Sequence, residues 1–265
     1  MPTPTLTRML SRLILQMEGE SLGCPLLLFF LLFSAVLHAN QFPFAFFDPP
    51  SGWFLSPSRH FEDGVKIGFV ESKKKIFSPS ITLSIEKISC SEEEYLKNVK
   101  TAHSFDRIKD VRVLGIFETN SGKAHLLQID TKHPWGDIRM LQALLIKQGY
   151  AHIHTAACLK TDFAKIRDQL LKSFQSLRVS FDFFSTVHDN KKLENSFNYL
   201  KMAWKDYAES ERNHGKGSFR KDLFQKTQWL PFIEVIKKDY ADLGICWQIL
   251  AIEYLKEELV RPTSA

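Results

Sequence analysis

The chain of 265 residues lacks most of the features that announce a particular chemistry. Its Lys and Arg residues are interleaved with acids and form no stripe of one sign, which argues against a nucleic acid as partner. Gly215-Lys216-Gly217 lacks the leading glycine and the following Ser or Thr of a phosphate-binding loop. Ser121 and Cys158 are the only nucleophiles near histidine, and no hydrolase signature frames either of them. The sequence therefore predicts no specific enzymatic reaction.

The chain also has only four cysteines, so a disulfide framework cannot be what holds it together. What it does have is apolar material: 44% hydrophobic residues, 12% aromatic residues and 22 Phe, with a net charge of only +5. A disordered chain would have fewer aromatics and a larger net charge. The length allows one large domain, or a domain of roughly 150 residues and a smaller unit.

The N-terminal region resembles an export signal. Leu22–Leu37 is an uncharged apolar run whose core is short enough for a secretory signal peptide and too short for a typical membrane span. Arg8 and Arg12 precede it, and Ala39 offers a small residue for cleavage. We expect residues 1–39 to be a signal peptide and the mature protein to be periplasmic or secreted, with an uncleaved inner-membrane anchor as the alternative. Cys24 precedes the apolar core of this run, Pro25–Leu37, which argues against a lipoprotein.

The next segment, residues 40–180, predicts an antiparallel α+β domain. Apolar residues at every second position indicate strands at 65–70, 80–88, 111–119, 123–131, 138–147 and 150–158. Ser91 followed by three Glu residues indicates the start of a helix that ends near His103, and a second helix should span residues 161–177. Short turns join the last four strands, and such turns require antiparallel pairing. We expect a sheet with helices on its faces.

The C-terminal region, residues 187–262, predicts a helical hairpin or a three-helix extension. Leu193, Phe197, Leu200, Trp204 and Tyr207 follow one another at spacings of four, three, four and three. This apolar seam is either core or a surface that binds a partner. The stretch from Leu243 to Leu255 is too short to span a membrane and contains Glu253, so no stable span is expected after signal cleavage.

Several motifs between about Phe42 and Val179 resemble the PsbP-like fold family, which includes periplasmic DcrB-type proteins. They are PPSGW at Pro49–Trp53, the helix opening SEEEYL, the strand GYAHIHTAA and the closing helix DFAKIRDQLLKSFQSLRV. The resemblance implies an α/β/α sandwich around an antiparallel sheet. It also implies export in many members, and accessory or binding roles without a shared catalytic set, so no catalytic residue is carried over.

Three histidines form the candidate metal site. His152 and His154 are two residues apart on one expected strand, so their side chains project from the same face. If His125 on a neighbouring strand joined them, three imidazoles would provide a site for zinc or copper. The alternative is that two histidines on one strand face mark a half-solvated sheet surface.

Cleavage after Ala39 would leave Cys90, Cys158 and Cys246. Cys90 and Cys158 each close an expected strand just before an expected helix, which makes them the candidate disulfide pair. The alternative is that all three thiols are buried as small apolar groups.

We therefore expect a non-enzymatic, exported accessory or binding protein of the bacterial envelope, with another envelope protein as its partner. One alternative is a metal-binding protein or enzyme that uses the His152 and His154 face. The other is a secreted protein-interaction factor that acts through its helical tail.

Overall fold

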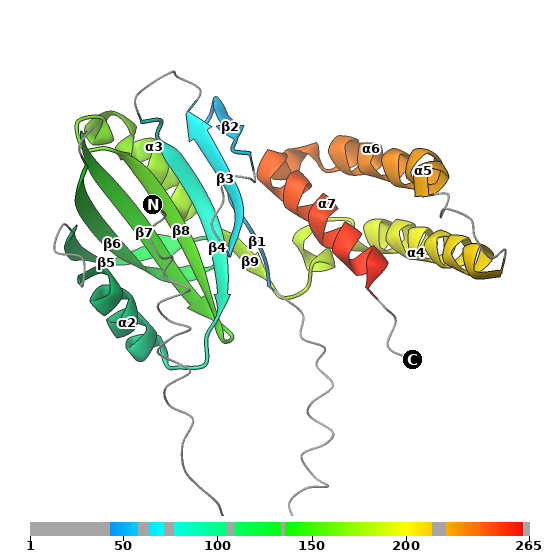
Figure 1. Cartoon of the computed structure of the whole chain (residues 1–265), viewed down its shortest axis with the longest axis horizontal. Helices are drawn as coiled ribbons and strands as arrows, with labels where there is room; N and C mark the ends of the chain where they lie inside the picture. The colour runs from blue at the N-terminus through cyan, green and yellow to red at the C-terminus, as the bar shows by residue number, and fades with distance from the viewer. Residues whose placement is uncertain are drawn as a thin grey trace, which may run out of the picture. The chain divides into compact units, whose positions relative to one another are not determined.

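The computed structural model describes residues 43–57, 64–71, 77–104, 109–133, 136–213 and 221–261. The expected signal peptide, residues 1–39, lies outside the described residues, as does the Gly215–Gly217 loop. The chain divides into two compact units (Figure 1). The first unit holds the chain up to Pro43 and Pro49–Leu177, and the second holds Phe44–Asp48 and Arg178–Ala265.

The first unit is built on a seven-stranded sheet in the order β2-β3-β4-β8-β7-β6-β5, and every neighbouring pair is antiparallel. The six longer strands lie where the period-two pattern predicted them, and the three-residue β2 was not predicted. The strands are β2 (Trp53–Leu55), β3 (Val65–Glu71), β4 (Ser80–Lys87), β5 (Lys109–Thr119), β6 (Gly122–His133), β7 (Gly136–Lys147) and β8 (Tyr150–Leu159).

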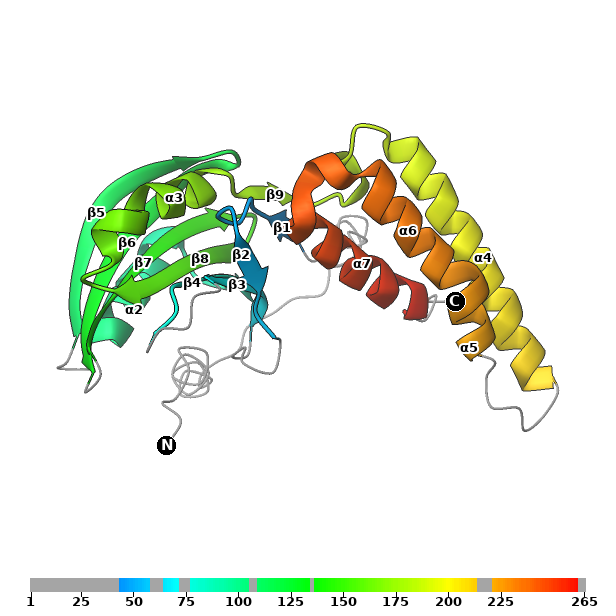
Figure 2. The ribbon, with the colours of Figure 1, turned by 90° about the horizontal axis from the view of Figure 1, so that it is seen from above.

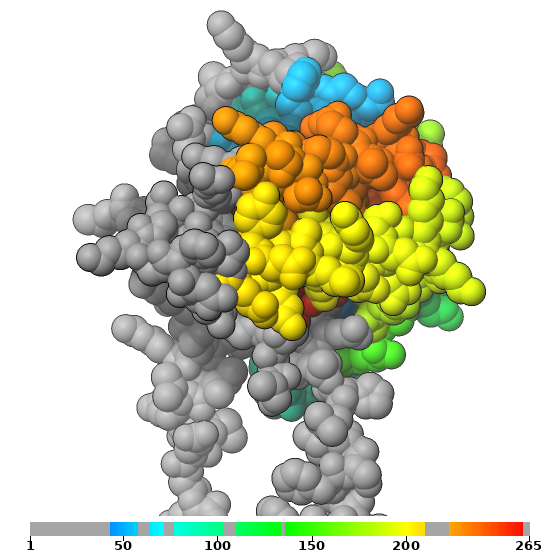
Figure 3. Space-filling model, turned by 90° about the vertical axis from the view of Figure 1, so that its right-hand side faces the viewer, coloured from blue at the N-terminus to red at the C-terminus, as the bar shows by residue number. Residues whose placement is uncertain are grey.

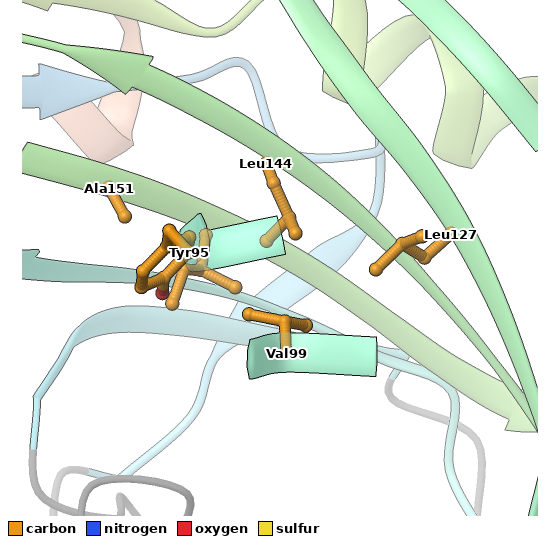
Figure 4. Close-up of a cluster of buried hydrophobic side chains, with 6 residues drawn as sticks. Tyr95, Val99, Leu127, Leu144 and Ala151 are labelled. Atoms are coloured by element: carbon orange, nitrogen blue, oxygen red, sulfur yellow. The ribbon is translucent and has the colours of Figure 1, made fainter. Parts of the chain in front are cut away.

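Helices α2 (Glu92–Ser104) and α3 (Phe163–Gln175) cover opposite faces of this sheet. Ser91 caps α2 as predicted, because its hydroxyl accepts the Glu94 N–H at 3.2 Å. Tyr95 and Val99 of α2 then pack on a cluster of buried sheet residues that includes Leu127 and Leu144 (Figure 4). The predicted α+β class, with helices on both faces of an antiparallel sheet, is confirmed.

The second unit combines a small sheet with helices (Figure 2). Strand β1 (Phe44–Phe46) pairs antiparallel with β9 (Arg178–Ser180). The helices are α4 (Asn190–Asn213), α5 (Lys221–Phe224), α6 (Leu230–Asp239) and α7 (Gly244–Val260), with short 3-10 turns at Phe184–Thr186 and Ala241–Leu243. The expected domain boundary after residue 180 thus differs from the observed one, since Phe44–Asp48 and β9 both belong to the helical unit.

A π-helical turn, Gln225–Trp229, joins α5 to α6, and the Leu230 N–H donates to the Gln225 carbonyl. Pro231 follows directly. Because proline has no N–H and its ring clashes with the carbonyl four residues before it, the wider turn accommodates the ring without breaking the helix.

Aromatic side chains form the core of the second unit. Phe183 stacks on Tyr254 with ring centroids 4.6 Å apart and meets Phe44 edge to face at 4.9 Å. Trp247 is fully buried, and its indole N–H donates to the Thr186 hydroxyl at 3.0 Å. The predicted seam of α4 also faces inward, because Leu193, Phe197 and Leu200 are buried. Among the described residues, no helix combines the length and the hydropathy that crossing a membrane requires.

Candidate functional site

His152 and His154 are both fully buried on β8. His152 lies between Ile85 and Leu145 on the neighbouring strands, and His154 lies between Leu83 and Ala143. The His154 ring packs 4.6 Å from the ring of Phe174 on α3. Within the described part of the chain, neither ring nitrogen of His152 has a hydrogen-bond partner. This pair is therefore part of the core under α3 and does not form a half-solvated surface.

Burial also determines the charge of the two imidazoles. Removal from water lowers the pKa of His152 to about 4, with a smaller contribution from the Lys147 charge, and lowers the pKa of His154 to about 3. Both rings are consequently neutral at physiological pH.

His125 does not join them. It pairs with Leu144 on β7, which pairs with Ile153 on β8, so its side chain lies on the α2 face of the sheet, opposite the other two histidines. There its Nε2 lies 2.8 Å from a carboxylate oxygen of Glu92. The described residues contain no group of three or more His, Cys, Asp or Glu side chains that could hold a metal. The three-histidine zinc or copper site is therefore not assembled.

The expected disulfide between Cys90 and Cys158 is not formed either. Strands β4 and β8 run antiparallel from the Ser80 and Ala157 pair to the Lys87 and Tyr150 pair. Cys158 lies beyond the first end and Cys90 beyond the second, so most of the length of the sheet separates them. A disulfide requires Cα atoms within about 7 Å.

The feature that the sequence did not predict is an open groove between α3 and strands β5 to β7. Its volume is about 510 Å³. Five of the nine residues that line it are large and apolar, and the others are small or polar; the nine are Leu114, Leu126, Gln128, Leu141, Phe163, Ala164, Arg167, Asp168 and Leu171. This volume is within the range of small-molecule sites in proteins.

A β-bulge shapes the rim of the groove. Val113 pairs with Leu127 and Gly115 pairs with Leu126, which leaves Leu114 as the extra residue of β5. Gly115 has a φ of +113°, a conformation that suits glycine. The bulge turns Leu114 toward the α3 face, where it lines the groove. A lone glycine within the apolar pattern of residues 111–119 is the sequence signal that could have indicated it.

An ion-pair network adjoins the groove through two of its lining residues, Phe163 and Gln128. Asp130 accepts two hydrogen bonds from Arg139, at 2.8 and 2.7 Å, and also contacts the Lys160 ammonium at 3.2 Å. The hydrogen bond from Arg139 holds the pKa of Asp130 below its usual value, although burial opposes the shift. The Arg139 guanidinium lies 4.9 Å above the ring of Phe163, which lines the groove.

Beyond this network lies a smaller hollow of about 180 Å³. Asp130 and Lys160 line it together with Asp110, Thr131, Lys132 and Asp137. The network lines this hollow and contacts Phe163 and Gln128 of the groove, so a charged cluster lies next to the apolar trough.

The second unit has a hollow of its own, of about 420 Å³, beside the neighbouring helices α4 and α6 (Figure 3). Tyr199 lines it and is 69% exposed, and Met202, one turn further along α4, is 67% exposed. Exposed side chains of this size at adjacent turns are typical of a helix surface that contacts a partner.

Solved structures that are similar to part of the chain include three proteins of low sequence identity. LpqN of Mycobacterium tuberculosis, described as involved in cell envelope biogenesis, aligns over 54% of this chain and 87% of its own, with 13% identity and a TM-score of 0.42. PsbP (CyanoP) of the cyanobacterium Synechocystis aligns over 54% and 96%, with 10% identity and a TM-score of 0.37. A Pseudomonas aeruginosa protein of unknown function, described as a putative regulator, aligns over 48% and 96%, with 11% identity and a TM-score of 0.36.

Cyanobacterial PsbP is thus among the structures similar to part of this chain. No protein-family model matches the chain, and no curated protein matches it. Likeness at this level concerns the fold alone, so any function has to be inferred from the sites.

Proposed function

We propose that the protein is an exported, non-enzymatic binding or accessory protein of the bacterial envelope, and that the groove beside α3 is its ligand site. The observation that carries this proposal is the groove itself. It joins a trough of apolar side chains to a fixed cluster of charges, and binding sites for small molecules combine these two elements. Export is supported by Leu22–Leu37 and the two arginines before it.

Photo-crosslinking in cells tests the binding site. A photoreactive residue at Leu114, inside the groove, should capture an envelope component, whereas the same residue at Ile116 should not. Ile116 is a matched control because it lies on the same strand and is 57% exposed, yet pairs with His125 on the opposite face. Equal capture at both positions, or capture at neither, would count against the groove.

Cell fractionation tests export. The tagged chain should accumulate in the envelope fraction, and Phe30→Arg, which interrupts the apolar run, should hold it in the cytoplasm. If the chain remains cytoplasmic without that substitution, export is wrong and the groove proposal has to be tested inside the cell.

A second candidate function is docking of a protein partner on the helical unit. It is favoured by the exposure of Tyr199 and Met202 beside the hollow of α4. A photoreactive residue at Met202 should then capture a protein, while the Leu114 position captures a molecule of small mass. Capture of a protein at Leu114 would reverse this assignment.

A further inference from the structure

The apolar groove and the charged cluster next to it differ in chemistry, and this difference selects a class of ligand. We propose that the groove binds one amphiphile with an anionic head group, its apolar chain lying along the leucines and its head facing Arg139 and Lys160. This inference rests on the proposed function, since it names the ligand of the same site.

The trough accounts for the apolar chain. Leu126 and Leu141 come from neighbouring strands of the sheet, and Leu171 comes from α3. Leu114, which is 49% exposed, forms the outer rim, where an apolar ligand would remove it from water. Between these side chains the polar lining consists of Gln128, Arg167 and Asp168 only. A ligand without a long apolar portion would leave most of the apolar surface of the groove exposed to water.

Arg139 accounts for the head group. Its side chain is only 18% exposed, yet among the described residues only two of its five N–H groups have an acceptor, both on Asp130. A guanidinium in this position binds a carboxylate or phosphate oxygen more strongly than a neutral acceptor. The guanidinium lies over Phe163, which lines the groove, so Arg139 stands at the boundary between the trough and the charged cluster.

The charge balance favours an anion as well. Asp130 is shared by Arg139 and Lys160, so two cations face one carboxylate. Of the other two acids that line the hollow, Asp110 is bonded to Arg112 at 2.6 Å, and Asp137 lies opposite Lys132 on the neighbouring strand. Over a longer range, residues 49–177 carry 19 Lys and Arg against 14 Asp and Glu, while the second unit carries 14 of each. The whole net charge of the chain therefore belongs to the unit that contains the groove, where it attracts anions.

Titration calorimetry on the full chain tests the proposal with decanoate, dodecanoate and 1-dodecanol, each below the concentration at which it aggregates. Dodecanoate should bind with a stoichiometry of one and at least tenfold more tightly than 1-dodecanol. Lengthening the acid from ten to twelve carbons should tighten binding about tenfold, because each buried methylene contributes a factor of roughly three to four.

Matched variants locate the ligand. Leu114→Asp should weaken dodecanoate binding at least tenfold, and Ile116→Asp, on the other face of the same strand, should leave it unchanged. Lys160→Gln should remove most of the preference for the acid over the alcohol, whereas Lys165→Gln, at a 78% exposed position of α3, should preserve it.

Three results would overturn the inference: equal affinity for acid and alcohol, equal effects of the two aspartate substitutions, or binding to anionic phospholipid vesicles without binding of monomeric dodecanoate. If dodecanoate fails to bind while a photoreactive residue at Leu114 still captures an envelope component, the ligand class is wrong and the proposed function stands. If both experiments fail, the groove is not a binding site.

Discussion

Mild acid should loosen the sheet of the first unit, because His152 and His154 are buried under α3 without charge. Their pKa values in the folded protein are about 4 and 3, against 6.5 in an unfolded chain. Each pKa is lowered on folding, so the stability that each neutral imidazole contributes is complete above pH 6.5. It is lost as the pH falls through the window between 6.5 and the folded values.

The size of the effect follows from the pKa difference. At pH 5.5 an unfolded histidine is mostly protonated while a buried one is not, which costs the folded state about 1.4 kcal/mol for each residue. The two residues together should therefore lower the free energy of unfolding by about 3 kcal/mol between pH 7.5 and 5.5. Asp130, whose pKa is lowered, adds acid sensitivity only as the pH falls toward and below its ordinary value, so the change between pH 7.5 and 5.5 reports on the histidines.

Amide hydrogen exchange of β8 measures this effect in the first unit alone, whereas a denaturation curve of a chain with two units would sum both. After correction for the intrinsic pH dependence of exchange, protection of β8 should fall about a hundredfold between pH 7.5 and 5.5, provided that β8 exchanges through unfolding of the whole unit. His152→Leu should reduce that fall about tenfold, since 1.4 kcal/mol is a factor of ten. His133→Gln, at an exposed position at the end of β6, is the control and should change nothing.

Two outcomes would refute the reasoning. If His152→Leu keeps the full pH dependence, the imidazole is already solvated or charged in the folded protein. If His133→Gln abolishes the dependence, the titrating group lies at the surface. Leucine suits the test because replacing a buried polar group that has no partner leaves no donor or acceptor unsatisfied.

Three further predictions concern the ion pair, the division of the chain and the thiols. Asp130→Asn should destabilise the first unit by about 2 kcal/mol in urea titrations, because it leaves Arg139 partly buried without a counter-charge; an unchanged midpoint would show that the pair contributes nothing. A chain of residues 49–177 should elute as a monomer in gel filtration, while residues 43–177 should aggregate through uncovered β1; the opposite order would contradict the assignment of β1 to the second unit. Alkylation in denaturant without reductant should label both Cys90 and Cys158, and protection of both would instead indicate a bridge.

Local patterns were enough to predict most of the first unit. Alternating apolar residues predicted six strands, and the turns between the last four predicted their antiparallel order. Ser91 and the acids after it predicted the start of α2, and the capping bond is present. Each of these signals lies within a few residues of the element that it specifies.

Register was the part that single-strand patterns could not supply. His152 of β8 pairs with Leu145 of β7. His125 of β6 pairs with Leu144, which is the residue before Leu145 on the same strand. A difference of one residue moves a side chain to the other face, so His125 was assigned to the wrong group. The groove was missed for a related reason, since its rim depends on the extra residue Leu114 in the bulge.

Pairing over long sequence separation was also invisible. Strands β1 and β9 have three residues each, too few to show a period, and more than 130 residues separate them. The expected first domain therefore begins at residue 40, although Phe44, Phe46 and Phe47 are buried and belong to the second unit.

The position of β1 also sets the order in which the protein can be completed. Phe44–Asp48 emerges from the ribosome before the whole of residues 49–177, yet its partner strand follows them. The sheet unit can therefore fold while the aromatic side chains of β1 still lack their packing partners, Arg178–Ser180 and α7. During that interval they are exposed to chaperones and to other chains. The helical unit cannot be completed before Arg178–Ser180 and the helices after it are available, and its formation joins the beginning of the described chain to its end.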